Sequence, residues 1–141
     1  QSNESILVLP ASTGYSSAII SNLAETVIAV EEEDNFISIA EKGMNKSGIN
    51  NVVVIKKKIN ENCLDQGPFN AIIIEGAIDY LPDQFLNQLE NHGRLFALIK
   101  KDDVTNAMLY IKNENSINSR FLFSCDAPKL NFFKKKNSFS F

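Results

Sequence analysis

The residues best suited to chemistry in this chain lie in a short turn of small side chains at positions 10–15. Ser12, Thr13, Gly14 and Tyr15 follow the first apolar run, where a buried strand is expected to end. Small side chains let a ligand approach the backbone, and a helix that starts here presents unpaired N–H groups. The turn has one glycine where a Gly-x-Gly-x-x-Gly dinucleotide motif needs three, so the turn alone is a weak signal.

A second candidate is Glu31, which follows the next β-branched run, residues 26–30. The carboxyl ends of parallel strands meet at one edge of a sheet, beside the turn after the first strand. A carboxylate there accepts two hydrogen bonds from a ribose diol, so Glu31 is a candidate ligand of a nucleoside. The alternative is structural, because residues 31–34 are all acidic and the helix dipole favours acids at the start of a helix.

Strand and helix signals alternate along the chain and predict the elements that position these residues. Short apolar runs are expected as strands, at residues 6–9, 26–30, 51–55, 69–74 and 94–99. Amphipathic stretches between them are expected as helices, starting near Ser16, Asp34 and Pro82. Buried strands that alternate with helices form right-handed βαβ units, which predicts an α/β fold with a mostly parallel sheet. Two extended runs, at 105–111 and 117–123, then predict a C-terminal antiparallel hairpin.

The same spacing predicts which helix residues face inward and where the helices end. The second helix is expected to turn one apolar face to the sheet, formed by Phe36, Ile39, Ala40, Gly43 and Met44. The third helix is expected to run from Pro82 through Leu89 and to end at Gly93.

Length and composition limit the class of protein. The 141 residues suit a single domain, and a content of 44% hydrophobic and 22% charged residues is typical of a globular chain. A net charge of −3 disfavours a nucleic-acid partner. No apolar run approaches the roughly 20 residues of a membrane helix, and no leader is visible, so we expect a cytoplasmic protein without a membrane partner. Two cysteines and one histidine predict no metal site, and the oligomeric state stays open.

The order of the elements carries a family resemblance over nearly the whole chain. The stretches that hold it are, in sequence order, ILVLPASTGYSSAII, VIAVEEEDNF, FNAIIIEGAIDYLPDQFLNQL and HGRLFALI. They resemble the protein-L-isoaspartate O-methyltransferases, within the class I S-adenosylmethionine-dependent methyltransferases. The resemblance implies a Rossmann-like three-layer sandwich, S-adenosylmethionine as cofactor, and isoaspartyl carboxylates of proteins or peptides as substrate, for protein repair. It also implies that residues 1–141 form a single methyltransferase-like domain, the C-terminal portion of a longer protein.

The resemblance also implies a cofactor site. Gly14 matches the last glycine of the first family motif, and Glu31 matches the acid that holds the ribose hydroxyls. The implied cofactor-binding residues are therefore Ser12, Thr13, Gly14, Tyr15 and Glu31. No catalytic residue is named, because methyl transfer to a carboxylate depends largely on positioning and desolvation.

Four positions depart from the family pattern. Pro10 and Ser12 stand where the family usually has glycines, and Val8 stands where an acid usually helps to hold the methionine end. Lys57 or Lys58 falls where the family tends to have an acid near the adenine. Valine and lysine side chains accept no hydrogen bond, and the fixed φ of proline excludes a positive-φ conformation. The cofactor site is therefore expected to be weak, or lost altogether.

Two functions remain open on these observations: a methyltransferase, and a non-catalytic methyltransferase-like domain that serves in binding or as a scaffold. A nucleotide-dependent oxidoreductase is disfavoured by the poor glycine pattern and by the closing hairpin. Glu75, at the end of the fourth predicted strand, points toward the same edge. It either faces the methyl acceptor or pairs with a neighbouring lysine, and the structural role is slightly favoured.

Overall fold

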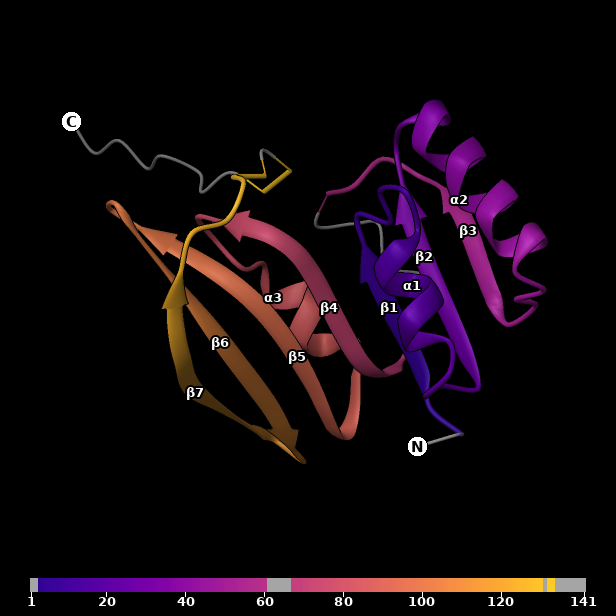
Figure 1. Cartoon of the computed structure of the whole chain (residues 1–141). Coiled ribbons are helices and arrows are strands. Elements are labelled where there is room, and N and C mark those ends of the chain that lie inside the picture. The colour runs from indigo at the N-terminus through magenta and orange to yellow at the C-terminus, as the bar shows by residue number, and fades with distance from the viewer. Residues whose placement is uncertain (1–2, 61–66, 131, 134–141) are drawn as a thin grey trace.

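The structure is a computed structural model that describes residues 3–60, 67–130 and 132–133. In this part of the chain, seven strands form one sheet in the order β3-β2-β1-β4-β5-β6-β7 (Figure 1). The strands are β1 (Ser5–Leu9), β2 (Thr26–Glu31), β3 (Val52–Lys56), β4 (Phe69–Ile78), β5 (Leu89–Lys101), β6 (Val104–Asn113) and β7 (Ser116–Cys125). The helices described between them are α1 (Tyr15–Ile20), α2 (Asp34–Lys46) and α3 (Asp83–Asn87).

The sheet is parallel around its centre and antiparallel at one end. β1 pairs in parallel with β2 on one side and with β4 on the other. β3 extends the parallel part beyond β2, and β5 extends it beyond β4. β6 and β7 follow as an antiparallel hairpin. The predicted α/β architecture and its closing hairpin are therefore confirmed, and the boundary between β1 and β4 is the switch point where such sheets bind ligands.

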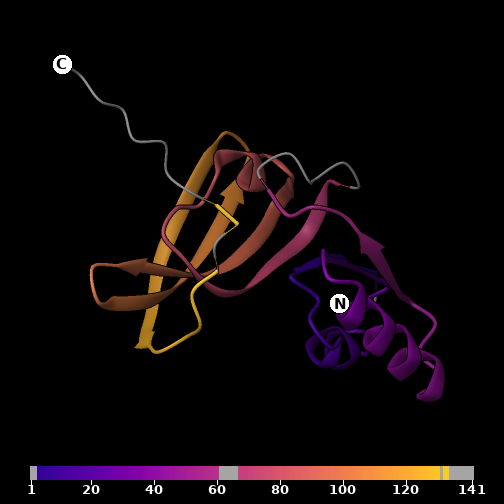
Figure 2. The same cartoon turned by 90° about the horizontal axis from the view of Figure 1, so that it is seen from above.

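Side chains of β1 alternate between two apolar cores, one on each face of the sheet. Val8 lies in the core on the α1 side, against Ile20. Leu7 and Leu9 lie in the larger core on the opposite side, which includes Phe85 of α3. Figure 2 shows α1 and α2 on one side of the sheet and α3 on the other. The two cores therefore hold the three layers together.

A segment that follows β7 returns to the middle of the sheet. Ala77 N–H donates to the Pro128 carbonyl (2.8 Å), and Leu130 N–H donates to the Ala77 carbonyl (2.7 Å). Leu130 also fills the space beside Gly76, where an added Cβ would lie 2.5 Å from the Leu130 side chain. This support lets β4 continue to Ile78, beyond its predicted end.

The third helix is shorter than predicted. α3 ends at Asn87 and β5 begins at Leu89, so the expected continuation to Gly93 is wrong. Leu89 is buried and is the register partner of Phe69 in β4. Phe69 N–H also donates to the Gln88 carbonyl (2.7 Å). Strand pairing with β4 therefore overrides the helical spacing of this segment.

α2 presents a narrower apolar face than predicted. Ala40 and Met44 are buried as expected. Exposed instead are the other three residues of the predicted face, Phe36, Ile39 and Gly43. The reason is the close contact of Gly14 with Ala40 and Met44, which fixes the side of α2 that faces the sheet.

Two further properties hold for the described residues. No helix among them is both long enough and apolar enough to cross a bilayer. No group of three or more His, Cys, Asp or Glu side chains in the same residues is arranged to hold a metal ion.

Candidate functional site

The turn after β1 is held against the end of β2. Ala11 N–H donates to the Val30 carbonyl (2.8 Å), and Gly14 N–H donates to the Ala11 carbonyl (2.9 Å). Ser12 has a φ of +52°, in the left-handed region that favours glycine. The backbone at Ser12 therefore keeps a glycine-like shape, although a serine stands there.

Glu31 lies beside this turn and is almost completely buried, with 2% of its surface exposed. Its Oε1 accepts a hydrogen bond from Ser12 N–H (2.7 Å). Its Oε2 accepts two more, from the N–H groups of Glu32 (2.8 Å) and Glu33 (3.1 Å). A carboxylate offers about four acceptor positions. Three of them are filled, so Glu31 keeps capacity for about one further hydrogen bond.

The structure brings the predicted site residues to one edge of the sheet, with different surroundings. Thr13 is exposed, and Tyr15, the first residue of α1, has 74% of its surface exposed. Gly14 is buried with a φ of +84°. A Cβ at Gly14 would lie 2.9 Å from Ala40 Cβ, so this glycine is required for packing against α2. Its assignment to the cofactor stays a prediction, as do those of the other four residues.

The departures from the family pattern also have definite places. Val8 has no exposed surface and lies inside the core on the α1 side, so its side chain does not reach the edge. Lys57 lies at the edge, where its N–H donates to the Glu31 carbonyl (3.0 Å). Lys58 is exposed. The adjacent Lys56 forms an exposed ion pair with Asp34 (2.7 Å).

Glu75 occupies the opposite side of the turn from Glu31. It follows Ile74, the register partner of Leu9 at the end of β1. Its carboxyl group is half-buried and hydrogen-bonds with the Ser16 side chain. Burial raises the pKa of the Glu75 carboxyl above its ordinary value of 4.5, and the hydrogen bond with Ser16 opposes that rise. Among the described residues, no salt bridge to a lysine involves Glu75.

Sequence reasoning missed the two serines of the first turn of α1. Ser16 contacts Glu75, and the Ser17 Oγ is buried without a hydrogen-bond partner in the described structure. A pair of serines directly after the candidate turn was the available signal. Both place polar groups at the same edge as the predicted site.

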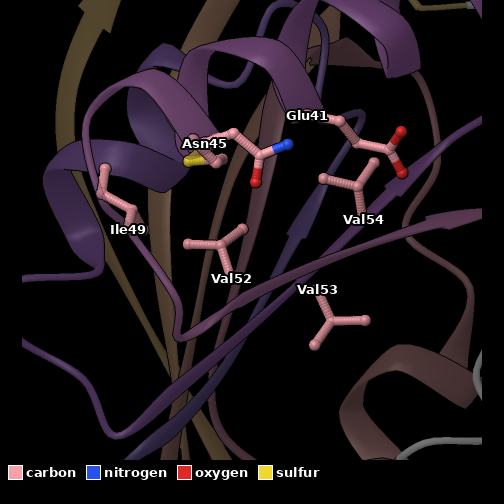
Figure 3. A pocket seen from close by; sticks show the side chains of 7 residues that line it. Glu41, Asn45, Ile49, Val52, Val53 and Val54 are labelled. Atoms are coloured by element: carbon pink, nitrogen blue, oxygen red, sulfur yellow. The ribbon is translucent and has the colours of Figure 1, made fainter.

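Two cavities lined by described residues lie elsewhere, and no predicted site residue lines either of them. One, of about 340 Å³, lies between α2 and β3, and Figure 3 shows most of its lining: Glu41, Asn45, Ile49, Val52, Val53 and Val54. The other, of about 290 Å³, lies beside α1 and is bordered by Glu4 and Arg94. The Arg94 guanidinium donates two hydrogen bonds to the Glu4 carboxylate (3.0 and 2.9 Å).

Comparison with known proteins decides the family. The family profile described as protein-L-isoaspartate(D-aspartate) O-methyltransferase (PCMT) matches residues 1–125. The chain belongs to the PCMT family. A protein-L-isoaspartate O-methyltransferase of Rhizobium meliloti is 29% identical over 129 residues, which cover 89% of this chain and 61% of the relative. Protein-L-isoaspartate O-methyltransferase 1 of Syntrophobacter fumaroxidans is 32% identical over 95 residues, covering 67% of this chain and 44% of the relative.

The chain spans about half the length of the curated PCMT relatives it matches, for example 51% of a protein-L-isoaspartate O-methyltransferase of Methanospirillum hungatei. Solved structures agree on the fold. One protein-L-isoaspartate O-methyltransferase superposes with a TM-score of 0.83 at 20% identity, covering 93% of this chain and 43% of the other. A Plasmodium falciparum protein, assigned as a beta-aspartate methyltransferase (PCMT) and in complex with S-adenosyl-L-homocysteine, gives a TM-score of 0.75 at 20% identity, covering 91% and 66%. The predicted Rossmann-like methyltransferase fold is therefore confirmed.

Proposed function

We propose that this PCMT-family protein is an S-adenosylmethionine-dependent methyltransferase that methylates isoaspartyl carboxylates in proteins or peptides. The observation that carries the proposal is the contact between Ser12 N–H and Glu31 Oε1 at the carboxyl ends of the parallel strands β1 and β2. The family match over residues 1–125 supports the isoaspartyl substrate. We also propose a cytoplasmic location and protein or peptide partners, with no membrane partner. The net charge of −3 disfavours a nucleic-acid partner.

The residues of the turn fit an adenosyl group. The turn places the small side chain of Ser12 beside Glu31, and Glu31 has capacity for one ribose hydroxyl. The unpartnered Ser17 Oγ, in the first turn of α1, offers a further polar group. When bound, the cofactor supplies an activated methyl group. The chain contributes position and exclusion of water, which suffice for transfer to a carboxylate.

The affinity for the cofactor is expected to be low. Val8 is enclosed in an apolar core and accepts no hydrogen bond from the ligand. Backbone N–H groups already occupy most of the acceptor positions of Glu31. Each missing hydrogen bond to a charged group costs about 1.5–3 kcal/mol. That corresponds to roughly a 10- to 100-fold rise in Kd for each one.

The same observations favour a second candidate function, a methyltransferase-like binding domain without cofactor or catalysis. In that case the bonds from Ser12, Glu32 and Glu33 to Glu31 would only hold the turn against β2. The two candidates differ in whether the edge binds an adenosyl compound.

Titration calorimetry with S-adenosylhomocysteine separates the two functions. We expect the chain to bind the ligand, Glu31→Gln to weaken binding about tenfold or more, and Glu33→Gln to leave it unchanged. Glu33 is the matched control because it is an exposed acid in the same segment. No heat of binding at millimolar ligand would establish the binding-domain function instead. In the whole protein, methyl transfer to an isoaspartyl peptide but not to its aspartyl isomer would test the substrate.

A further inference from the structure

Glu75 is a carboxyl group whose surroundings the fold alone does not explain. It is half-buried at the ligand-binding edge of the sheet, and its described partner is the neutral hydroxyl of Ser16. Burial of a carboxylate without a cation is unfavourable, which is why the pKa of this group is raised. A cationic ligand group beside Glu75 would remove that cost.

Most other acids at this edge already have partners, and Glu33 is exposed to solvent. Glu31 accepts three backbone N–H groups, and Glu32 accepts the Ile59 N–H (2.5 Å). Asp79 is paired with Lys129 (2.9 Å). Glu75 is therefore the acid at this edge that is best placed to meet a positive charge brought by a ligand.

The register of the sheet puts Glu75 next to the turn. Leu9, the last residue of β1, pairs with Ile74, so Glu75 lies beside the start of the turn. Its hydrogen bond with Ser16, a residue of α1, places the Glu75 carboxyl group on the α1 face of the sheet, the face on which Val8 lies. Its bond to Ser16 aims the carboxyl group at the start of α1. β4 thus supplies a carboxylate on the α1 face of the sheet. On this face, β1 has only the enclosed, apolar Val8.

S-adenosylmethionine and S-adenosylhomocysteine both end in an amino acid whose ammonium group is positive. We propose that Glu75 binds this ammonium group, while the turn and Glu31 hold the adenosyl end. This inference rests on the proposed function and names the residue that anchors the second end of the cofactor. It also accounts for the Val8 departure, since the anion is supplied by the neighbouring strand.

Two ligands that differ in the amino-acid end test the inference by calorimetry. S-adenosylhomocysteine carries the ammonium group, and 5′-deoxy-5′-methylthioadenosine lacks the whole amino acid. In Glu75→Gln, which keeps the size of the side chain and an acceptor for Ser16, we expect Kd for S-adenosylhomocysteine to rise about tenfold or more. Kd for methylthioadenosine should stay within about twofold. Glu75→Asp keeps the charge and should retain more of the affinity than Glu75→Gln.

A matched control removes one negative charge from an exposed position of α2. Glu41→Gln should leave both dissociation constants unchanged. If Glu75→Gln binds both ligands as the wild type does, or loses both equally, the inference is overturned while the proposed function stands. If the wild type binds neither ligand, the proposed function fails, and the inference fails with it. Equal urea unfolding midpoints for the variants and the wild type exclude loss of the fold as the cause.

Discussion

Gly14 gives the sharpest test of how the turn is built, through the substitution Gly14→Ala. A Cβ at this position would lie 2.9 Å from Ala40 Cβ, 3.0 Å from Met44 Cε and 3.2 Å from Ala40 Cα. The φ of +84° is in addition one that L side chains rarely adopt. The substitution therefore combines backbone strain with a steric clash against α2.

The two costs can be estimated separately. A non-glycine residue in the left-handed region costs about 1–2 kcal/mol. Forcing a methyl group into a close-packed contact costs about 1–3 kcal/mol. The reduced freedom of the unfolded chain returns about 0.4–1 kcal/mol. The net loss of unfolding free energy is therefore about 1–4.5 kcal/mol, or about 3–15 °C in Tm for a protein of this size.

Two other glycines isolate the two costs in urea unfolding experiments. A Cβ at Gly48 meets no atom within 4 Å, but its φ is +69°, so Gly48→Ala should show the backbone cost alone. A Cβ at Gly43 also meets nothing within 4 Å, and this helical residue has no positive φ. Gly43→Ala should therefore stabilise the protein by up to about 1 kcal/mol. If Gly14→Ala lowers the urea midpoint no more than Gly48→Ala does, the argument from the α2 contact is refuted.

Three further substitutions test the core and its edges, each by urea unfolding. Val8→Glu places an unpaired carboxylate in an apolar core and should cost about 3 kcal/mol or more; a variant as stable as the wild type would contradict the enclosure of Val8. Phe133→Ala removes a buried ring whose centroid lies 4.9 Å from that of Phe85 and should cost about 3–5 kcal/mol; an unchanged midpoint would contradict that packing. The hydrogen bonds from Arg94 lower the pKa of Glu4 below its ordinary value of 4.5, so the charged Glu4 stabilises the fold above that pH. The free energy of unfolding of the wild type should therefore exceed that of Glu4→Gln by about 1 kcal/mol or less at pH 7. This difference should vanish as the pH falls through the lowered pKa of Glu4. A difference that grows in acid would contradict the prediction.

Much of the fold could be predicted from the sequence because local pattern and tertiary pairing agree there. Continuous apolar runs in β1 and β2 gave strands near their observed ends. The pattern failed where a long-range contact decides the outcome. Leu89 has helical spacing from Phe85, yet pairing with Phe69 makes it the first residue of β5. Likewise Ile39 fits an inward helix face, but contact with Gly14 turns it outward.

The candidate site was predictable in position but not in detail. The order of elements was enough to bring Ser12 and Glu31 to one edge, where they are hydrogen-bonded. The sequence did not reveal that backbone N–H groups occupy most of the Glu31 carboxylate, because those bonds depend on the three-dimensional path of the turn. It also did not reveal the bond between Glu75 and Ser16, which lie far apart in the chain.

The return of the chain to β4 after β7 affects the order in which the two sides of this edge can form during synthesis. The surroundings of Glu31 use residues up to Ile59, whose N–H donates to Glu32. The surroundings of Gly76, which is adjacent to Glu75, include the side chain of Leu130. During synthesis on the ribosome, one half of the ligand edge therefore has its contacts long before the other. If the proposed function holds, a nascent chain should acquire its full affinity for the cofactor only after Leu130 has been synthesised.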